Sequence, residues 1–325
     1  MANHKYVVTE EETGERLDAY LAHKSSRSRS LIQEQIKAGR ASINGKCVTK
    51  SSTPLSFGDE ITLSIEERAS SSHLEPVAAA IDILYEDNHL LLINKPQGLV
   101  VHPAAGHSGP TLVHHLLHHL KSSTDFLESA ALRPGIVHRL DKGTSGVLLI
   151  AKNRKTQEAL SEQFKSRTVT KIYECIVWGQ VHRPGTLKNP IGRDRIHRKK
   201  MSSRTTKSRA AETRIEPLTL FSAFTHLQVK PLTGRTHQIR VHLSEFGHSI
   251  VGDPLYGKGA TAKRLELVSK PIAFQLAQLQ HPFLHAHSLT FQHPVTGIEM
   301  TCSAPRPQLF NDFLSLLGSY HADGK

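Results

Sequence analysis

Short segments with β-strand character dominate residues 79–317, and they constrain the fold more than any other feature of the sequence. Helical patterns interrupt them near 111–120, 156–166 and 236–246. The strand-like runs, each bounded by turn residues, are 82–85, 90–93, 147–151, 171–177, 223–229 and 289–292. Strands in series with a few interspersed helices are typical of an α+β domain. We therefore expect an α+β domain built on a mostly antiparallel, mixed sheet.

A smaller α/β module is expected at residues 15–66. Its apolar residues recur at helical spacing in two segments and alternate in two short ones, at 16–22, 30–38, 41–43 and 60–63. Residues 67–78 then have the Ser-rich, polar composition of a linker, and Pro76 breaks any helix there. A chain of 325 residues is long enough for two such domains.

The basic residues of the small module are concentrated in one stretch. Residues 24–50 hold seven bases against one acid, among them Arg29, Lys37, Arg40 and Lys46. This charge fits either a solvated helix face or a surface that contacts phosphates. Charge alone leaves both interpretations open.

The whole chain carries a formal net charge of +12. An excess of this size indicates a polyanionic partner, in the first place nucleic acid and less readily an anionic membrane. No run approaches the roughly 18 apolar residues of a membrane span, so we expect no membrane partner. The N-terminus has no apolar signal region, and three scattered cysteines offer neither a disulfide framework nor a CxxC pair. We expect a reduced, cytoplasmic protein that acts as a monomer.

Histidines crowd the segment 111–120, TLVHHLLHHL, where an i,i+4 spacing first suggests a metal site. The apolar residues Val113, Leu116, Leu117 and Leu120 form a helical stripe, however, which sends the histidines to the solvent face. No acid or cysteine of the segment completes a ligand set, so we expect no metal. The HExxH, P-loop and GxGxxG signatures do not occur either.

Residues 193–209, RDRIHRKKMSSRTTKSR, form the densest block of charge, with eight bases against one acid. Its polar composition predicts a mobile loop in the free protein. The alternatives are a solubilising insertion and a loop that clasps the substrate. We favour the second, because such a charge density repels itself unless phosphates neutralise it. The candidate RNA-binding residues here are Arg195, Arg198, Lys199 and Lys200.

Asp141 is the most interesting acid of the chain, in the segment 135–153, GIVHRLDKGTSGVLLIAKN. Arg139 and Lys142 flank it, a glycine turn follows, and an apolar run then predicts a buried strand. An acid in this setting is a candidate reactive carboxylate, although most such strings are surface ion pairs.

A second string with chemical potential is residues 233–243, TGRTHQIRVHL. If a helix opens after Gly234, Thr236 and Arg240 lie four residues apart and share a face. Arg240 would then reach a carboxylate from elsewhere in the fold. An ordinary helix with a surface arginine is the alternative.

Taken together, these strings resemble two known families. Residues 28–30 and Ile43-Asn44-Gly45-Lys46 are similar to the S4 RNA-binding domain. The larger domain resembles the RluA/RluD family of RNA pseudouridine synthases, through motifs spread over the whole domain: NKPQGLVVHP at 94–103, HRLD at 138–141 with TSG at 144–146, KIY at 171–173, GRTHQIR at 234–240, GDPLYG at 252–257 and LHA at 284–286.

The resemblance implies an isomerase that converts uridine to pseudouridine, most readily in large-subunit ribosomal RNA. Asp141 would be the catalytic carboxylate, Tyr173 the aromatic packed against the uracil, and Arg240 the ion-pair partner of Asp141. Arg139 would help to extrude the nucleotide, and Lys142 would face the RNA. One departure is Gly143, where many relatives carry a polar residue.

This chemistry suits the residue types. One ionised carboxylate, without metal or cofactor, can either attack the sugar or remove a proton from C2′. An aromatic ring can stack on the base while it turns. The rival interpretations are a synthase acting on transfer RNA, a non-catalytic S4-type RNA-binding or ribosome-assembly protein, and a DNA-binding regulator. The last lacks an evident two-helix reader with half-site symmetry in the larger domain.

Overall fold

The chain folds into two compact units, residues 1–73 and 74–325. The computed structural model describes residues 2–25, 27, 29–65, 74–103, 107–121, 135–197, 199–257 and 262–322. Each unit has hydrophobic clusters of its own. The expected limits of 15–66, 67–78 and 79–317 stay a prediction.

The N-terminal unit packs two helices on a four-stranded sheet. Its sheet has the order β1-β4-β2-β3, and all pairs are antiparallel. The elements are β1 (Ala2–Val7), α1 (Leu17–Lys24), α2 (Arg29–Lys37), β2 (Ala41–Ile43), β3 (Lys46–Cys47) and β4 (Glu60–Ile65). Leu17 and Leu21 of α1 meet Ile32 and Ile36 of α2 in the core, as the helical spacing predicts. Strand β1 lies before residue 15, outside the predicted module.

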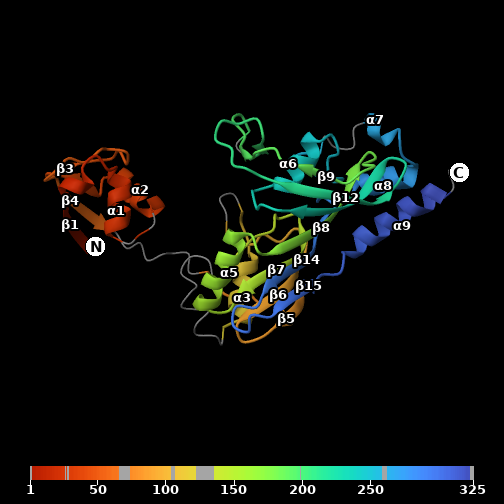
Figure 1. Ribbon diagram of the computed structural model, residues 1–325, viewed down its shortest axis with the longest axis horizontal. Helices are drawn as coiled ribbons and strands as arrows, with labels where there is room; N and C mark the ends of the chain where they lie inside the picture. The colour runs from red at the N-terminus through yellow and green to blue at the C-terminus, as the bar shows by residue number, and fades with distance from the viewer. Residues whose placement is uncertain are drawn as a thin grey trace. The chain divides into compact units, whose positions relative to one another are not determined.

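The larger unit is built on a nine-stranded mixed sheet (Figure 1). The strand order is β5-β6-β7-β14-β8-β13-β12-β9, and β15 pairs with β14. Only the β7–β14 pair is parallel. The strands of this sheet are β5 (Ile83–Glu86), β6 (Leu90–Lys95), β7 (Ser145–Ala151), β8 (Thr170–Trp178), β9 (Gly185–Leu187), β12 (Thr213–Leu220), β13 (Phe224–Pro231), β14 (Leu284–Gln292) and β15 (Glu299–Ser303). The expected α+β class with a mostly antiparallel sheet is confirmed.

Helices cover both faces of this sheet. They are α3 (Leu112–His119), α5 (Arg154–Ser166), α6 (Gln238–Glu245), α7 (Ala262–Leu265), α8 (Lys270–Ala277) and α9 (Gln308–Ala322). Cys175 of β8 packs in the cluster of α6, whereas its neighbour Ile176 packs in the cluster of α8 and α9. Successive side chains of a strand point to opposite faces, so α6 lies on one face and α8 and α9 on the other.

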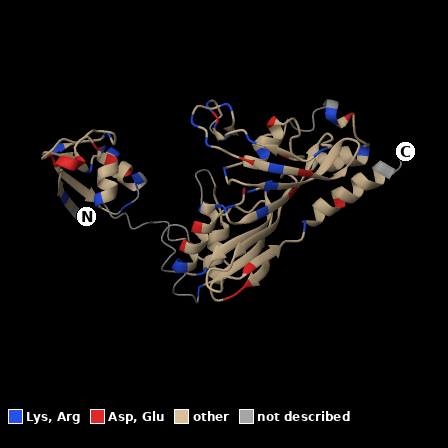
Figure 2. Ribbon diagram, in the orientation of Figure 1, with Lys and Arg blue, Asp and Glu red and all other residues tan. Residues whose placement is uncertain are grey.

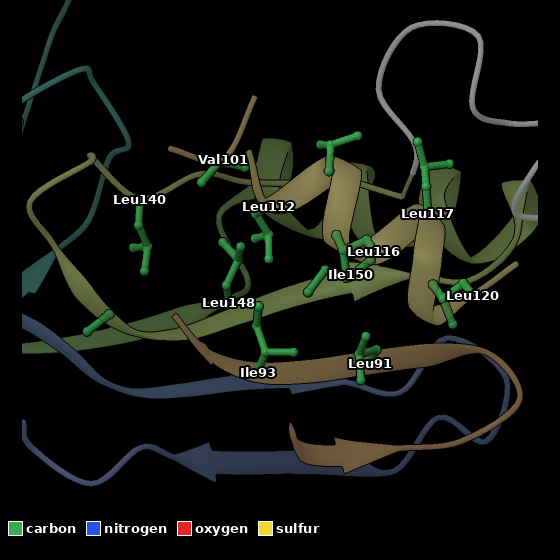
Figure 3. Close-up of a cluster of buried hydrophobic side chains, with 12 residues drawn as sticks. Leu91, Ile93, Val101, Leu112, Leu116, Leu117, Leu120, Leu140, Leu148 and Ile150 are labelled. Atoms are coloured by element: carbon green, nitrogen blue, oxygen red, sulfur yellow. The ribbon is translucent and has the colours of Figure 1, made fainter. Parts of the chain in front are cut away.

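Helix α3 carries its apolar stripe into the core, as predicted. Leu116 and Leu117 lie against Leu91, Leu148 and other side chains of β6 and β7 (Figure 3). Burying one such leucine stabilises the fold by about 1.5–3 kcal/mol. The four histidines of α3 are half-buried or exposed. Among the described residues, no group of three or more His, Cys, Asp or Glu side chains is arranged to hold a metal ion.

The segment 193–209, predicted to be a mobile loop, contains a short strand pair in its first half. Strands β10 (Gly192–Arg193) and β11 (Met201–Ser202) pair as a hairpin, which we call the basic hairpin. The carboxylate of Asp194 accepts hydrogen bonds from the backbone N–H groups of Ile196 and His197 and so closes the tip. Lys and Arg line the loop that carries this hairpin (Figure 2). Local turn chemistry thus orders a segment whose composition alone indicates mobility.

Candidate active site

Asp141 lies in the turn that leads into β7, and its neighbours fix that turn. The side chain of Leu140 is buried in the α3 cluster (Figure 3). The ring of His138 accepts a hydrogen bond from the backbone N–H of Leu149 at 2.9 Å. Burial lowers the pKa of His138 to about 3, with help from Lys171, so the ring is neutral and free to accept.

A buried lysine holds the other side of the turn. Lys95, at the end of β6, is fully buried, and its Nζ donates to the carbonyls of Pro96, Leu99 and Lys142. Burial lowers the pKa of Lys95 to about 7, although the charge of Asp141 opposes this effect, and the three carbonyls replace the water that Nζ loses on burial. Because Lys142 follows Asp141 directly, these bonds restrict the backbone beside the carboxylate.

Glycines allow this turn to approach its neighbours. Gly146 has φ +110°, and a Cβ there would collide with the carbonyl oxygen of Ala286 in the parallel partner strand β14. A Cβ on Gly143 would lie 2.8 Å from Cδ of Pro282. The departure at Gly143 therefore has a steric reason, since Pro282 fills the space that a side chain would take.

Arg240 joins Asp141 to a second acid, Asp253. Its Nη1 donates to Oδ2 of Asp141 at 3.0 Å, while Nε and Nη2 form a two-pronged pair with Asp253 at 2.7 and 2.9 Å. Burial alone would lower the pKa of Arg240, but the bonds and charge of Asp253 outweigh it and raise that pKa further. The guanidinium is thus charged at any ordinary pH and orients the carboxylate of Asp141.

The helix that carries Arg240 begins later than predicted. Helix α6 starts at Gln238, so Thr236 lies in the preceding turn and does not share a helix face with Arg240. His237 caps the helix in the left-handed conformation, with φ 56° and ψ 19°. The side chain of Gln238 turns back to bond the backbone N–H of Arg235, which closes this sharp turn.

A cavity of about 470 Å³ brings the predicted catalytic residues together. Asp141, Tyr173 and Arg240 all line it, and so does the exposed Arg139. Its volume lies in the range of small-molecule sites, roughly 300–1,000 Å³. Six Lys and Arg side chains and a single acid are among the lining residues. Such a rim attracts a polyanion, while the one acid sits where a reacting group would enter.

Tyr173 supplies the aromatic wall of the cavity. It lies on β8 at the junction of two hydrophobic clusters. Burial raises the pKa of its phenol well above the ordinary value, and the charge of Asp141 adds to the effect. The ring therefore stays neutral and presents an apolar face, which suits stacking on a planar base.

The predicted RNA-binding residues have different surroundings. Lys142 is exposed but does not line the cavity. Arg29 donates two hydrogen bonds to the buried carboxylate of Asp18 and therefore also supports the fold of its unit. The others are exposed or half-buried, except Arg198, which lies outside the described residues: Lys37, Arg40, Lys46, Arg195, Lys199 and Lys200.

Three residues of the site received no role from the sequence. Asp253 and Tyr256 belong to the GDPLYG string, and His237 belongs to GRTHQIR, so the motifs contained them without indicating a contact. His237 Nε2 lies 3.8 Å from Oδ2 of Asp141. The guanidinium of Arg240 lies 5.0 Å from the ring centre of Tyr256, in cation–π range.

The geometry supports chemistry on an electrophilic carbon or an acidic C–H. A carboxylate, held by a permanent cation, lines a cavity with an aromatic wall. Such a group can attack a sugar carbon or accept a proton.

In the part of the chain that the structure describes, no helix is long and apolar enough to cross a membrane.

Known proteins are similar to this chain in sequence and in fold. Residues 89–245 match the family model described as RNA pseudouridylate synthase, and residues 15–61 match the S4 domain. The chain is 39% identical to the ribosomal large subunit pseudouridine synthase D of Pseudomonas aeruginosa, over 94% of this chain and 92% of that protein. It is 37% identical to the protein of the same name from Escherichia coli, over 97% and 94%. The solved structure of human RNA pseudouridylate synthase domain containing 4 superposes with a TM-score of 0.55 at 28% identity, over 73% of this chain and 93% of that one.

Proposed function

The chain belongs to the RNA pseudouridylate synthase family, and we propose that it isomerises specific uridines to pseudouridine in large-subunit ribosomal RNA. The observation that carries the proposal is the ion pair between Asp141 and Arg240 beside Tyr173 in one basic cavity. The relatives named for the large ribosomal subunit support ribosomal RNA as the substrate. The S4 match supports an RNA partner in general.

Asp141 is the catalytic carboxylate in this proposal, and no cofactor takes part. The bond between N1 of the uracil and C1′ of the ribose breaks, and a bond from C5 to C1′ forms. C5 loses its proton and N1 gains one, so the isomerisation is balanced without an external reagent. The carboxylate starts the reaction by attacking C1′ or by removing a proton from C2′.

Arg240 orients Asp141, because its guanidinium shares hydrogen bonds between two carboxylates. Tyr173 stacks on the uracil and holds it while the ring turns between the two bonds. Arg139, exposed at the rim, assists the extrusion of the target nucleotide. Unstacking a base costs a few kcal/mol, which favours a uridine in a flexible loop of the RNA.

The remaining basic residues are proposed to hold the RNA backbone. They are Lys142, Arg29, Lys37, Arg40, Lys46, Arg195, Arg198, Lys199 and Lys200. Each phosphate contact adds affinity that falls with rising salt. We further propose that the protein acts as a monomer, on ribosomal RNA or a pre-ribosomal particle, in the cytoplasm.

Release of tritium from RNA labelled at C5 of uridine tests the proposal. The purified protein is expected to release tritium from large-subunit ribosomal RNA and not from transfer RNA. Release from transfer RNA alone would overturn the ribosomal substrate. Release from neither RNA, with binding retained, would leave an RNA-binding protein without this activity.

A further inference from the structure

A chain of polar contacts connects the basic hairpin to the carboxylate of Asp141. The backbone N–H of Met201, on β11, donates to the hydroxyl oxygen of Tyr256 at 2.7 Å. That hydroxyl lies 2.8 Å from Nδ1 of His237. The other ring nitrogen of His237, Nε2, lies 3.8 Å from Oδ2 of Asp141.

The donors and acceptors along this series of contacts indicate where the protons of Tyr256 and His237 lie. Burial raises the pKa of Tyr256 to about 12, so its hydroxyl carries a proton. The hydroxyl oxygen already accepts from Met201, and its proton is satisfied when it is donated to Nδ1 of His237. Nδ1 is then the acceptor, and the proton of the neutral imidazole must sit on Nε2.

The charge of Asp141 favours the same tautomer. A bare Nε2 would direct its lone pair at the carboxylate, whereas an Nε2–H directs a positive hydrogen at it. Burial lowers the pKa of His237, although Asp141 opposes this effect. The ring is therefore neutral near pH 7 and carries one proton.

The surroundings fix the ring of His237. Its backbone adopts the left-handed conformation, which is uncommon for a residue other than glycine. Its ring meets the ring of Tyr256 edge to face at 5.5 Å. A backbone outlier beside a reactive group is a reason to look for a function.

We propose that His237 is a positioning residue that directs an Nε2 proton at Oδ2 of Asp141, and that Tyr256, anchored on the basic hairpin, holds the ring in this state. The inference rests on the proposed function, since it assigns a role at the same site. Arg240 also donates to Oδ2. Arg240 and His237 therefore act on the same oxygen of Asp141.

The hairpin gains a second role from this arrangement. Arg193 and Met201 are paired across it, so one strand carries a base toward the RNA while the other holds Tyr256. The same hairpin thus carries a basic residue and the backbone hydrogen bond that anchors Tyr256.

Two variants of His237 separate this role from mere packing. His237→Leu removes the polar N–H that lies 3.8 Å from Oδ2 and is expected to lower the single-turnover rate by about threefold to tenfold, less than the loss of a full hydrogen bond to a charged group would cause. His237→Gln places an amide N–H near the former Nε2 and is expected to restore most of the rate. RNA affinity should stay within about twofold of wild type in both. Equal rates for wild type and the folded Leu variant would overturn the proposal.

The pH dependence of the rate in Tyr256→Phe provides a second test. Without the hydroxyl, Nδ1 becomes available for a proton, and His237 becomes a cation at higher pH than in wild type. The charged groups around the ring are Asp141, Asp253, Arg240 and Arg139, and only the two acids favour that cation. The Nε2 proton stays in place when Nδ1 gains a proton, but the charge beside Asp141 changes, so the rate of Tyr256→Phe between pH 6 and 7 is expected to depend on pH differently from the wild-type rate. Parallel profiles would contradict the role of Tyr256.

Nitrogen NMR of the histidine-labelled full chain reports the tautomer directly. The signal that disappears in His237→Gln belongs to His237, and it should show Nε2 protonated and Nδ1 bare. A proton on Nδ1 would overturn the inference whatever the activity. If wild type releases no tritium, the proposed function fails, and this spectrum still decides the tautomer.

Discussion

Asp141, Arg240 and Asp253 form a charged group that is more than a simple ion pair. One guanidinium is shared between a fully buried acid, Asp253, and a partly exposed one, Asp141. Breaking a buried charge pair costs about 3–5 kcal/mol, because it leaves a charge without its partner. At the residue scale, the protein therefore uses Asp253 to fix Arg240, and Arg240 to present Asp141.

The first residue-scale prediction concerns the carboxylate. Asp141→Asn keeps the size of the side chain but removes its charge, so turnover should be abolished while RNA binding stays nearly unchanged. Tritium release and filter binding measure the two quantities on the same preparation. Retained turnover in this variant would remove Asp141 from its proposed role.

The second residue-scale prediction concerns Asp253 and the dependence of stability on pH. Burial raises its pKa, but the hydrogen bonds and charge of Arg240 outweigh burial, so the pKa lies below its ordinary value. The stabilisation that comes with this lowered pKa is fully present above about pH 4. It is lost as the pH falls through the pKa of Asp253 in the folded state. Asp253→Asn should therefore cost about 3 kcal/mol at pH 7 and less near pH 3.

Denaturant unfolding followed by fluorescence measures this difference. The single tryptophan, Trp178, lies on β8 of the larger unit, so its signal reports that unit. A stability loss that is the same at both pH values would contradict the assignment of the pKa to Asp253.

At the scale of elements, the basic hairpin and α6 act as one structure. The N–H of Ser203, which follows β11, donates to Glu245 at the end of α6, and Met201 bonds Tyr256. These contacts join the hairpin to the segment that carries Arg240 and Tyr256. The carboxylate of Asp194 accepts two backbone hydrogen bonds at the tip.

Charge reversal in the hairpin tests its contact with phosphates. Arg195→Glu with Lys199→Glu should weaken RNA binding and lower the slope of log affinity against log salt by about 1.5, since two phosphate contacts are lost. The matched control is Lys155→Glu with Lys270→Glu, which changes the charge equally at two exposed sites outside the hairpin and the cavity lining. Equal effects of the two pairs would indicate an unspecific effect of net charge.

At the scale of the whole molecule, two units with separate cores divide the work. The larger unit contains every residue that lines the cavity, and the N-terminal unit contains the S4 match. Under the proposed function, affinity from phosphate contacts would add over both units, while the chemistry would need only the larger one.

A deletion of residues 1–73 tests this division between the two units. The remaining chain should bind RNA more weakly and with a flatter salt dependence, because the bases of the N-terminal unit are gone. Its single-turnover rate at saturating RNA should stay close to wild type. An unchanged salt slope would mean that the N-terminal unit does not hold phosphates.

Much of the fold and the identity of the key side chains could be predicted from the sequence. Strand β7 is a continuous apolar run and α3 an amphipathic stripe, and such local patterns determine which element forms and which face is buried. The family motifs likewise pointed to Asp141, Tyr173 and Arg240, and the structure brings all three to one cavity.

Local sequence patterns thus predicted many of the elements and the fold class, and the family motifs indicated candidate reactive residues. Only the tertiary structure decided that Arg240 reaches both Asp141 and Asp253, that His237 turns its Nε2 toward Asp141, and that the basic hairpin is ordered and bonded to Tyr256. The reason is the sequence distance over which each kind of interaction acts. Periodicity acts within a few residues, whereas these contacts join positions up to 99 residues apart, and they exist only after β14 has inserted between β7 and β8 and α6 has packed on the sheet.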